Sequence, residues 1–197
     1  MSTSAKVTAR QRIENLLDDN SFVEIGAYVK ARNTDFNIQA KDTPSDGVIT
    51  GYGVINGGLV YVYSQDASVL GGSVGEMHAK KIASLYDMAM KTGSPVIGLI
   101  DSTGLRLQES VDGLNAFGQI YMKQSLASGV IPTITAIFGN CGGGLSIVAG
   151  LSDFTSWKLK MHSYSLTHLM QLQKTEKKSV TMHQLSSRAK KQEMLIS

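Results

Sequence analysis

The chain has 197 residues, of which 42% are hydrophobic and 18% are charged. That length accommodates one domain with a sizeable core, or two small domains. No apolar run approaches the roughly 18 residues of a membrane span, and residues 1–6 lack the apolar segment of a secretion signal, so a cytoplasmic protein is expected. The single cysteine, Cys141, excludes a disulfide within the chain and argues against a Cys/His cluster, so no metal is expected.

Charge and glycine are distributed unevenly along the chain. Residues 1–150 hold 11 Lys/Arg against 13 Asp/Glu, whereas residues 151–197 hold 8 against 3. All twenty glycines and all three prolines lie in the first 150 residues. The two segments therefore differ in composition, and the change falls near residue 155.

The first part of the chain predicts short elements. Residues 5–19 have apolar side chains at helical spacing and predict an amphipathic helix. Residues 22–25 predict a strand, and the polar residues 30–46 predict a loop. None of these elements alone points to a function.

A β-hairpin and a helix follow. Residues 48–55 and 59–64 are rich in β-formers, and the intervening Asn56-Gly57-Gly58 accepts the positive φ of a tight turn. A glycine-rich loop then leads into a helix predicted over 76–91.

The remaining elements predict repeated β-loop-α units. In chain order they are a strand at 96–101 buried on both faces, a helix at 107–128 interrupted near Gly113 and Gly118, a strand at 131–138, a glycine turn at 139–144 and a helix at 145–151. The fold class is therefore α/β, with its chemistry in the loops that follow strands.

Two strand ends carry the strongest candidate for chemistry. Residues 101–109 and residues 139–146 each take a buried strand through a small-residue turn into a helix. Such turns expose unpaired backbone N–H groups, and two that converge form an oxyanion hole able to stabilise an enolate. Glycine suits this role because a Cβ would hold the ligand away from the backbone. The alternative is that both are ordinary tight turns.

A serine hydrolase is a second interpretation of the glycine-rich loop. Gly71-Gly72-Ser73-Val74-Gly75 fits the nucleophile-elbow pattern and would make Ser73 the nucleophile. Its difficulty is the base, because the nearest histidine, His78, lies five residues away and is better explained as structural. Cys141 is better explained as a small buried side chain than as a nucleophile.

Several of these segments together resemble one known family. The sequence is similar to the carboxyltransferase (β) subunits of biotin-dependent acyl-CoA carboxylases and to the α subunits of sodium-pump acyl-CoA decarboxylases. The similarity covers about residues 5–155. It is carried by the stretches 61–66, 70–82, 101–109, 128–132 and 141–144.

The resemblance implies a crotonase-like α/β fold of repeated β-β-α units, of which this chain would hold the N-terminal carboxyltransferase domain. It further implies that backbone N–H groups from the two turns hold the thioester oxygen. The residues in matching positions are Gly143 and Gly144 on one side, and Gly104 and Leu105 on the other. The loop expected near the CoA nucleotide contains Ala67, Ser68, Gly71, Gly72 and Ser73.

The activity implied is carboxyl transfer between biotin and an acyl-CoA of the propionyl, methylmalonyl or glutaconyl type. Biotin would arrive on a separate carrier protein, and CoA thioester would be the substrate. The family also implies a homo-oligomer, with no nucleic acid and with a membrane contacted only through a decarboxylase complex. The runner-up is another crotonase-fold CoA enzyme, a hydratase or thioesterase.

This sequence departs from the family pattern at two positions of the first turn. Thr103 stands where the family has Gly, and Leu105 stands where it has Ala. Only the backbone of Leu105 is needed as a donor, but its larger side chain can narrow the acyl pocket.

The residues after about 155 do not continue the resemblance. We interpret 1–155 as an incomplete N-terminal domain and 156–197 as a frame-shifted or non-native basic tail, because a change of reading frame near Thr155 can restore family-like residues. The alternative is a natural basic tail that binds nucleic acid or anionic lipid. On the first interpretation the chain is an inactive or partial fragment.

Overall fold

A single mixed sheet forms the centre of the structure. The computed structural model describes residues 7–32 and 43–157, which belong to one compact unit, Met1–Leu166. The six strands follow one another in space in chain order: β1 Val23–Ile25, β2 Val48–Ile55, β3 Gly58–Gln65, β4 Val96–Ser102, β5 Thr133–Cys141 and β6 Phe154–Trp157. The pairs β1–β2 and β2–β3 are antiparallel, and the strands from β3 to β6 are parallel.

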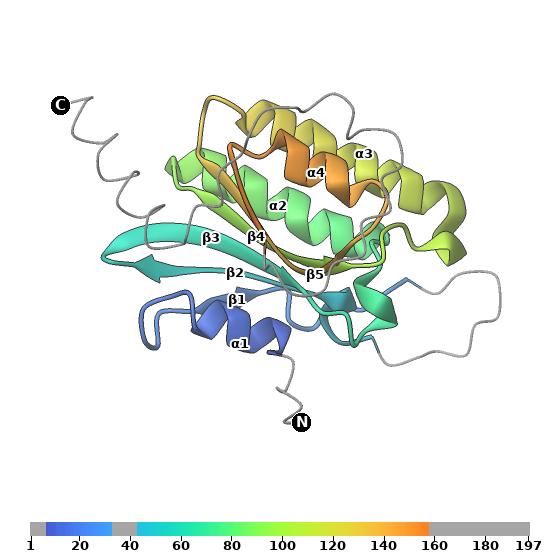
Figure 1. Cartoon of the computed structure of the whole chain (residues 1–197), viewed down its shortest axis with the longest axis horizontal. Helices are drawn as coiled ribbons and strands as arrows, with labels where there is room; N and C mark the ends of the chain where they lie inside the picture. The colour runs from blue at the N-terminus through green and yellow to red at the C-terminus, as the bar shows by residue number, and fades with distance from the viewer. Residues whose placement is uncertain (1–6, 33–42, 158–197) are drawn as a thin grey trace. The chain divides into compact units, whose positions relative to one another are not determined.

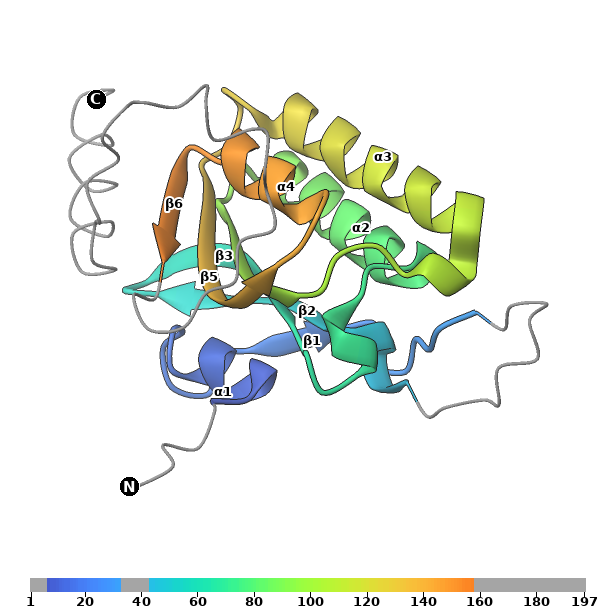
Figure 2. The same cartoon turned by 45° about the vertical axis from the view of Figure 1, so that its right-hand side comes forward.

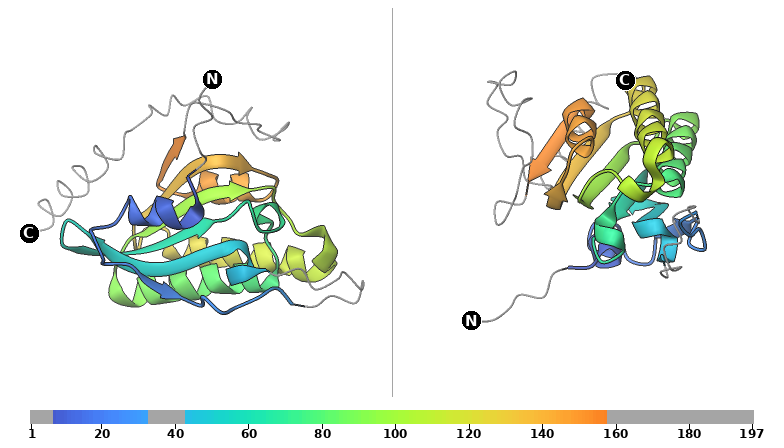
Figure 3. Two further views of the ribbon diagram at one scale, coloured as in Figure 1. Left: turned by 90° about the horizontal axis from the view of Figure 1, so that it is seen from below. Right: turned by 90° about the vertical axis from the view of Figure 1, so that its right-hand side faces the viewer.

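Helices cover both faces of this sheet. They are α1 Ala9–Glu14, α2 Glu76–Thr92, α3 Ser110–Ala127 and α4 Leu145–Leu151. Figure 1 and Figure 2 show α2, α3 and α4 on one face and α1 on the other, and Figure 3 shows α1 lying across the strands from below. In the ranges that the structure describes, no helix combines the length and the apolar character needed to cross a bilayer.

The side chains on the two faces of β3 pack into two separate hydrophobic cores. Tyr61 and Tyr63 point to the side of α2 and α3, where the larger core cluster lies. Val60 and Val62 point the other way and pack with Ile13 of α1. This alternation is the period of two that a strand imposes on its side chains, and it shows why the sheet must be covered on both sides.

The α/β prediction is confirmed, and the hairpin is its best-defined part. Ile55 pairs directly with Gly58, so the turn consists of Asn56 and Gly57, with φ of +51° and +83°. Two successive positive φ values are the signature of the turn that Asn-Gly favours. The helix expected over 76–91 is also confirmed, as α2.

Two element predictions were wrong in detail, and one strand was missed. The first helix is shorter than 5–19, because Thr8 caps it and it ends at Glu14. Helix α3 runs without interruption through Gly113 and Gly118, since one glycine costs a helix only about 1 kcal/mol and burial of the inner face outweighs that. Strand β6 was not predicted at all, although it pairs with β5 in register.

Gly98 gives the packing of the sheet a direct test. Tyr63 of β3 pairs with Gly98 of β4, and a Cβ on Gly98 would lie 2.3 Å from the buried Tyr63 hydroxyl. We expect Gly98→Ala to lower the free energy of unfolding by about 2 kcal/mol through overpacking, measured by urea denaturation. The control is Gly118→Ala in α3, where no atom lies within 4 Å of a new Cβ; it should be neutral or stabilising by up to about 1 kcal/mol. Equal losses in both variants would contradict this account.

Candidate functional site

The two glycine turns lie against each other at the carboxyl ends of β4 and β5. Ser102 pairs with Cys141 in the sheet, and the Gly142 N–H donates to the Ser102 carbonyl at 3.1 Å. A Cβ on Gly142 would lie 2.2 Å from the Thr103 carbonyl oxygen, and one on Gly104 would lie 2.9 Å from the Gly142 carbonyl oxygen. Only residues without side chains permit this approach, so the glycines bring the two turns together.

The first turn is held from its opposite side by Val74. The Val74 N–H donates to the Gly104 carbonyl (2.8 Å), and the Arg106 N–H donates to the Val74 carbonyl (2.9 Å). Together these bonds form a parallel bridge between Val74 and Leu105. In such a bridge the N–H of the central residue, here Leu105, points away from its partner. The Leu105 N–H therefore points away from Val74 and takes no part in the bridge.

Three backbone donors at these turns have no partner within the protein. Over residues 7–32 and 43–157, no hydrogen bond is found for the N–H groups of Leu105, Gly143 and Gly144. Gly143 has a φ of +52° and is exposed, and no atom lies within 4 Å of the position its Cβ would take. The turns therefore offer three unpaired donors, with open space beside Gly143, which suits an anionic oxygen.

The loop expected near CoA only partly reaches these turns. The Thr103 N–H donates to the Gly71 carbonyl (3.0 Å), and a Cβ on Gly72 would lie 2.4 Å from the Asp101 carbonyl oxygen. Ser68 instead closes a local turn, donating through its N–H and hydroxyl to Asp66 Oδ1 at 2.9 and 2.6 Å. For Ala67, beside it, no hydrogen bond to the turns is found within the described residues.

Arg106 occupies the interior directly after Leu105. Its guanidinium is 3% exposed and donates from Nη1 to Asp46 Oδ1 (2.6 Å) and to Glu109 Oε1 (2.8 Å). It also donates from Nε to Ser73 Oγ (3.2 Å) and from Nη2 to the Ser73 carbonyl (2.8 Å). Burial raises the pKa of Asp46, and the charge of Arg106 opposes that rise.

The same two carboxylates close the N-terminus of α2. Asp46 Oδ2 accepts from the His78 N–H (2.7 Å), and Glu109 Oε2 accepts from the Glu76 N–H (2.5 Å). The first N–H groups of a helix have no partner within it and carry positive potential, so distant carboxylates are stabilising there. Arg106 is thereby tied to the start of α2.

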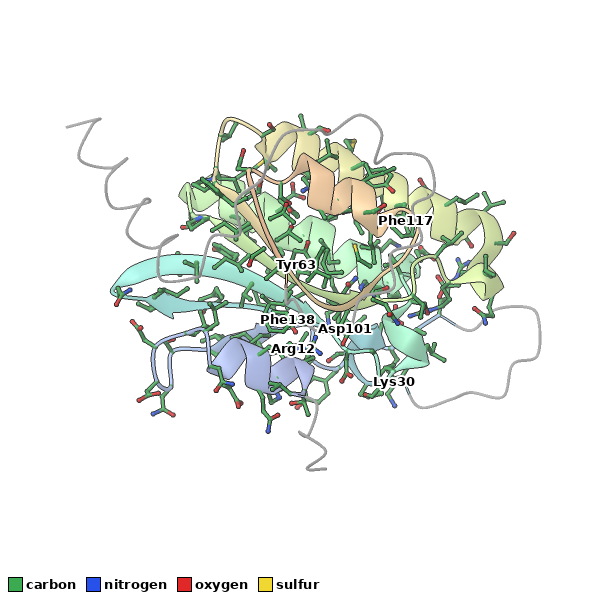
Figure 4. The ribbon with its side chains drawn as sticks, in the orientation of Figure 1. Arg12, Lys30, Tyr63, Asp101, Phe117 and Phe138 are labelled. Carbon is green, nitrogen blue, oxygen red and sulfur yellow. The ribbon has the colours of Figure 1, made fainter. Side chains whose placement is uncertain are left out.

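A second buried ion pair lies beneath the other turn. Arg12 of α1 donates to Asp101 Oδ2 at 2.7 Å, and Figure 4 shows the two side chains meeting between α1 and the sheet. Asp101 Oδ1 accepts from the Asn140 N–H (3.2 Å), and a Cβ on Gly139 would lie 1.9 Å from the same oxygen. Asp101 therefore links the end of β4 to the end of β5.

Gln65 and His78 connect the two ion pairs through neutral groups. His78 Nδ1 lies 2.9 Å from the Asp46 carbonyl, which can only accept, so the ring proton sits on Nδ1. His78 Nε2 then accepts from Gln65 Nε2 (3.2 Å), and Gln65 Oε1 accepts from the Asp101 N–H (3.3 Å). Burial, followed by the charge of Arg106, lowers the pKa of His78 to about 3.

These contacts remove the basis for a serine hydrolase. The Ser73 hydroxyl oxygen accepts from Arg106 Nε, and this cation cannot accept the serine proton. Both ring nitrogens of His78 are engaged with other groups. Cys141 is 2% exposed, and burial raises the pKa of its thiol to about 11, so it packs as a neutral side chain.

The sequence missed the residues that support the turns. Arg12, Asp46, Gln65 and Glu109 come from four separate segments, and no local pattern marks any of them as buried. The signal available was weak: Asp46-Gly47 looked like an ordinary loop dipeptide. Of the tail proposed over 156–197, residues 158–197 lie outside the described residues, and Ser156 and Trp157 belong to β6.

Comparison with known proteins identifies the class. The Carboxyl transferase domain family matches residues 2–186, and the chain belongs to that family. It is 50% identical over 151 residues to the methylmalonyl-CoA decarboxylase α subunit of Propionigenium modestum, covering 77% of this chain and 29% of the relative. It is 51% identical over 149 residues to the propionyl-CoA carboxylase β chain of Roseobacter denitrificans, covering 76% and 29%.

Solved structures agree with the sequence comparison. Transcarboxylase 12S with hydrolysed methylmalonyl-CoA bound is 43% identical with a TM-score of 0.74, over 76% of this chain and 30% of that chain. A Pseudomonas malonate decarboxylase hetero-tetramer in complex with malonate is 27% identical with a TM-score of 0.68, over 76% and 58%. The chain therefore has the crotonase-like carboxyltransferase fold, but spans less than a third of the length of the curated relatives it matches.

The buried His78 predicts how stability depends on pH. The unfolded chain binds a proton at His78 near pH 6.5 and the folded chain only near pH 3, so the unfolded state binds more protons between these values and stability falls as pH falls. His78→Asn keeps a donor for the Asp46 carbonyl but does not titrate. Between pH 6.5 and 4.5 we therefore expect the free energy of unfolding of this variant to fall by about 2 kcal/mol less than that of the native chain. Urea unfolding at several pH values measures this. Parallel pH profiles of the two proteins would contradict it.

Proposed function

We propose that this chain forms the acyl-CoA side of a biotin-dependent carboxyltransferase acting on a short acyl-CoA of the propionyl or methylmalonyl type. The supporting relatives are named as a propionyl-CoA carboxylase β chain and a methylmalonyl-CoA decarboxylase α subunit. The observation that carries the proposal is the cluster of unpaired donors on Leu105, Gly143 and Gly144 at two turns in contact.

The role of these donors is to stabilise charge on the thioester oxygen. Carboxyl transfer at the carbon next to a thioester passes through an enolate, whose negative charge develops on that oxygen. N–H groups fixed in place before the reaction stabilise this charge, and one such donor is worth about 3–4 kcal/mol in the transition state. The chain's contribution is therefore binding and electrostatic stabilisation from its backbone.

The carboxylates near the turns are already paired, which favours a proton acceptor that does not come from this chain. Asp101 is paired with Arg12, and Asp46 and Glu109 are paired with Arg106, all of them buried. Biotin, when bound on its carrier, supplies the activated carboxyl group and a basic urea nitrogen, and the open glycine cradle at Gly143 leaves room for ligands.

We also propose that the chain works in an oligomer. The outward face of α3 carries apolar side chains, with Val111 72%, Leu114 61%, Met122 53% and Leu126 56% exposed. Contiguous exposed apolar surface of this kind marks contacts between proteins. Light scattering on the full chain tests this; a monomer at all concentrations would contradict it.

Binding of acyl-CoA to the donors can be tested at Gly143. A Cβ there would enter the open space beside the donors, so we expect Gly143→Ala to weaken propionyl-CoA binding about fivefold or more through loss of a hydrogen bond, and to leave free CoA binding unchanged. Calorimetry on folded protein measures both. The control is Gly150→Ala in α4, where a new Cβ also meets no atom within 4 Å; its affinities should equal those of the native chain.

Two results would count against the proposal. Absence of propionyl-CoA binding by the native chain would remove its basis. Equal weakening of propionyl-CoA and free CoA by Gly143→Ala would place the turn away from the thioester. Hydration of crotonyl-CoA, or release of free CoA from propionyl-CoA, would instead favour the hydratase or thioesterase alternative.

A further inference from the structure

Arg106 holds together the two segments that orient the Leu105 donor. The direction of the Leu105 N–H is set by the bridge between Leu105 and Val74. Arg106 is the residue after Leu105, and Ser73 is the residue before Val74. The Arg106 side chain donates to both the hydroxyl and the carbonyl of Ser73, so it fastens the same two segments a second time.

The other end of the guanidinium is anchored to rigid structure. Nη1 donates to Asp46 and Glu109, and these carboxylates accept from the first N–H groups of α2. A side chain held at both ends by buried partners cannot move without breaking several charge-assisted hydrogen bonds at once. The position of Leu105 is thereby fixed relative to α2, a helix of 17 residues.

We propose that Arg106 is a positioning residue for carboxyl transfer: it fixes the aim of the Leu105 N–H at the thioester oxygen without touching the substrate. This inference rests on the proposed function. Its basis is geometric, because the Arg106 side chain is 3% exposed and donates four hydrogen bonds, all of them to groups of the protein.

Arginine is needed for this role because of its shape. A lysine at the same position keeps a positive charge for Asp46 and Glu109, but its single ammonium group cannot reach across to both acceptors of Ser73 as the planar fork does. Arg106→Lys should therefore preserve most of the charge pairing and loosen the hold on the Leu105–Val74 bridge. That separates positioning from charge.

The test is the infrared stretching frequency of the thioester carbonyl, labelled with ¹³C in propionyl-CoA and bound to the full chain. Hydrogen bonds to the oxygen lower this frequency, and we expect Arg106→Lys to lose more than half of the native shift. The dissociation constant should change by less than about tenfold, the worth of one net hydrogen bond. A purely structural role would lower stability without changing the shift per bound ligand.

Two further variants keep the test decisive. Thr133→Val removes hydroxyl contacts with Asp153 (2.9 and 3.1 Å) at the other end of β5; it should lower stability and keep the native shift. Ser73→Ala removes only the Nε contact and should give a smaller loss in the same direction, so it serves if Arg106→Lys does not fold. If the carbonyl frequency shift in Arg106→Lys equals that of the native chain, the inference about Arg106 is wrong and the proposed function still stands. The same holds for Ser73→Ala where Arg106→Lys is unfolded. No thioester binding by the native chain overturns the proposed function and the inference with it.

Discussion

The buried cation of Arg106 is the interaction on which the arrangement of the site depends. A guanidinium that is 3% exposed has lost its water, and it is tolerated only because two carboxylates and two acceptors of Ser73 surround it. Each partner belongs to a different segment: the turn before β2, the start of α3 and the loop before α2. The need to pair one charge thus gathers three segments beneath the first turn.

Neutral groups allow a second buried pair to lie close by. Arg12 and Asp101 satisfy each other under the other turn, and Gln65 and His78 fill the space between the pairs with hydrogen bonds. Burial is the main reason that the pKa of His78 falls to about 3, and the charge of Arg106 lowers it further. The support of both turns is therefore one connected polar network in which the histidine must stay neutral.

Local chemistry explains what could be predicted from the sequence. Asn56-Gly57 specifies a turn by its own φ values, and the apolar run at 96–101 needs burial on both faces wherever it lies. The glycines of both turns were recognised because their role is a backbone property. The ion pairs were not, since Arg12 and Asp101 are 89 residues apart and nothing in either local sequence indicates that the two meet. Strand β6 also depends on its neighbour, because it forms by pairing with β5.

Leu105 shows how a departure from the family pattern can leave the donor in place. Its side chain packs with the main core, and a Cβ on Gly113 of α3 would lie 3.0 Å from its Cδ1. The glycine that was expected to interrupt the helix thus makes room for the leucine in a continuous one. Because the side chain is accommodated against α3, the bridge to Val74 keeps its geometry and the N–H stays unpaired. The larger residue therefore changes the packing behind the turn, and the donor depends only on the main chain.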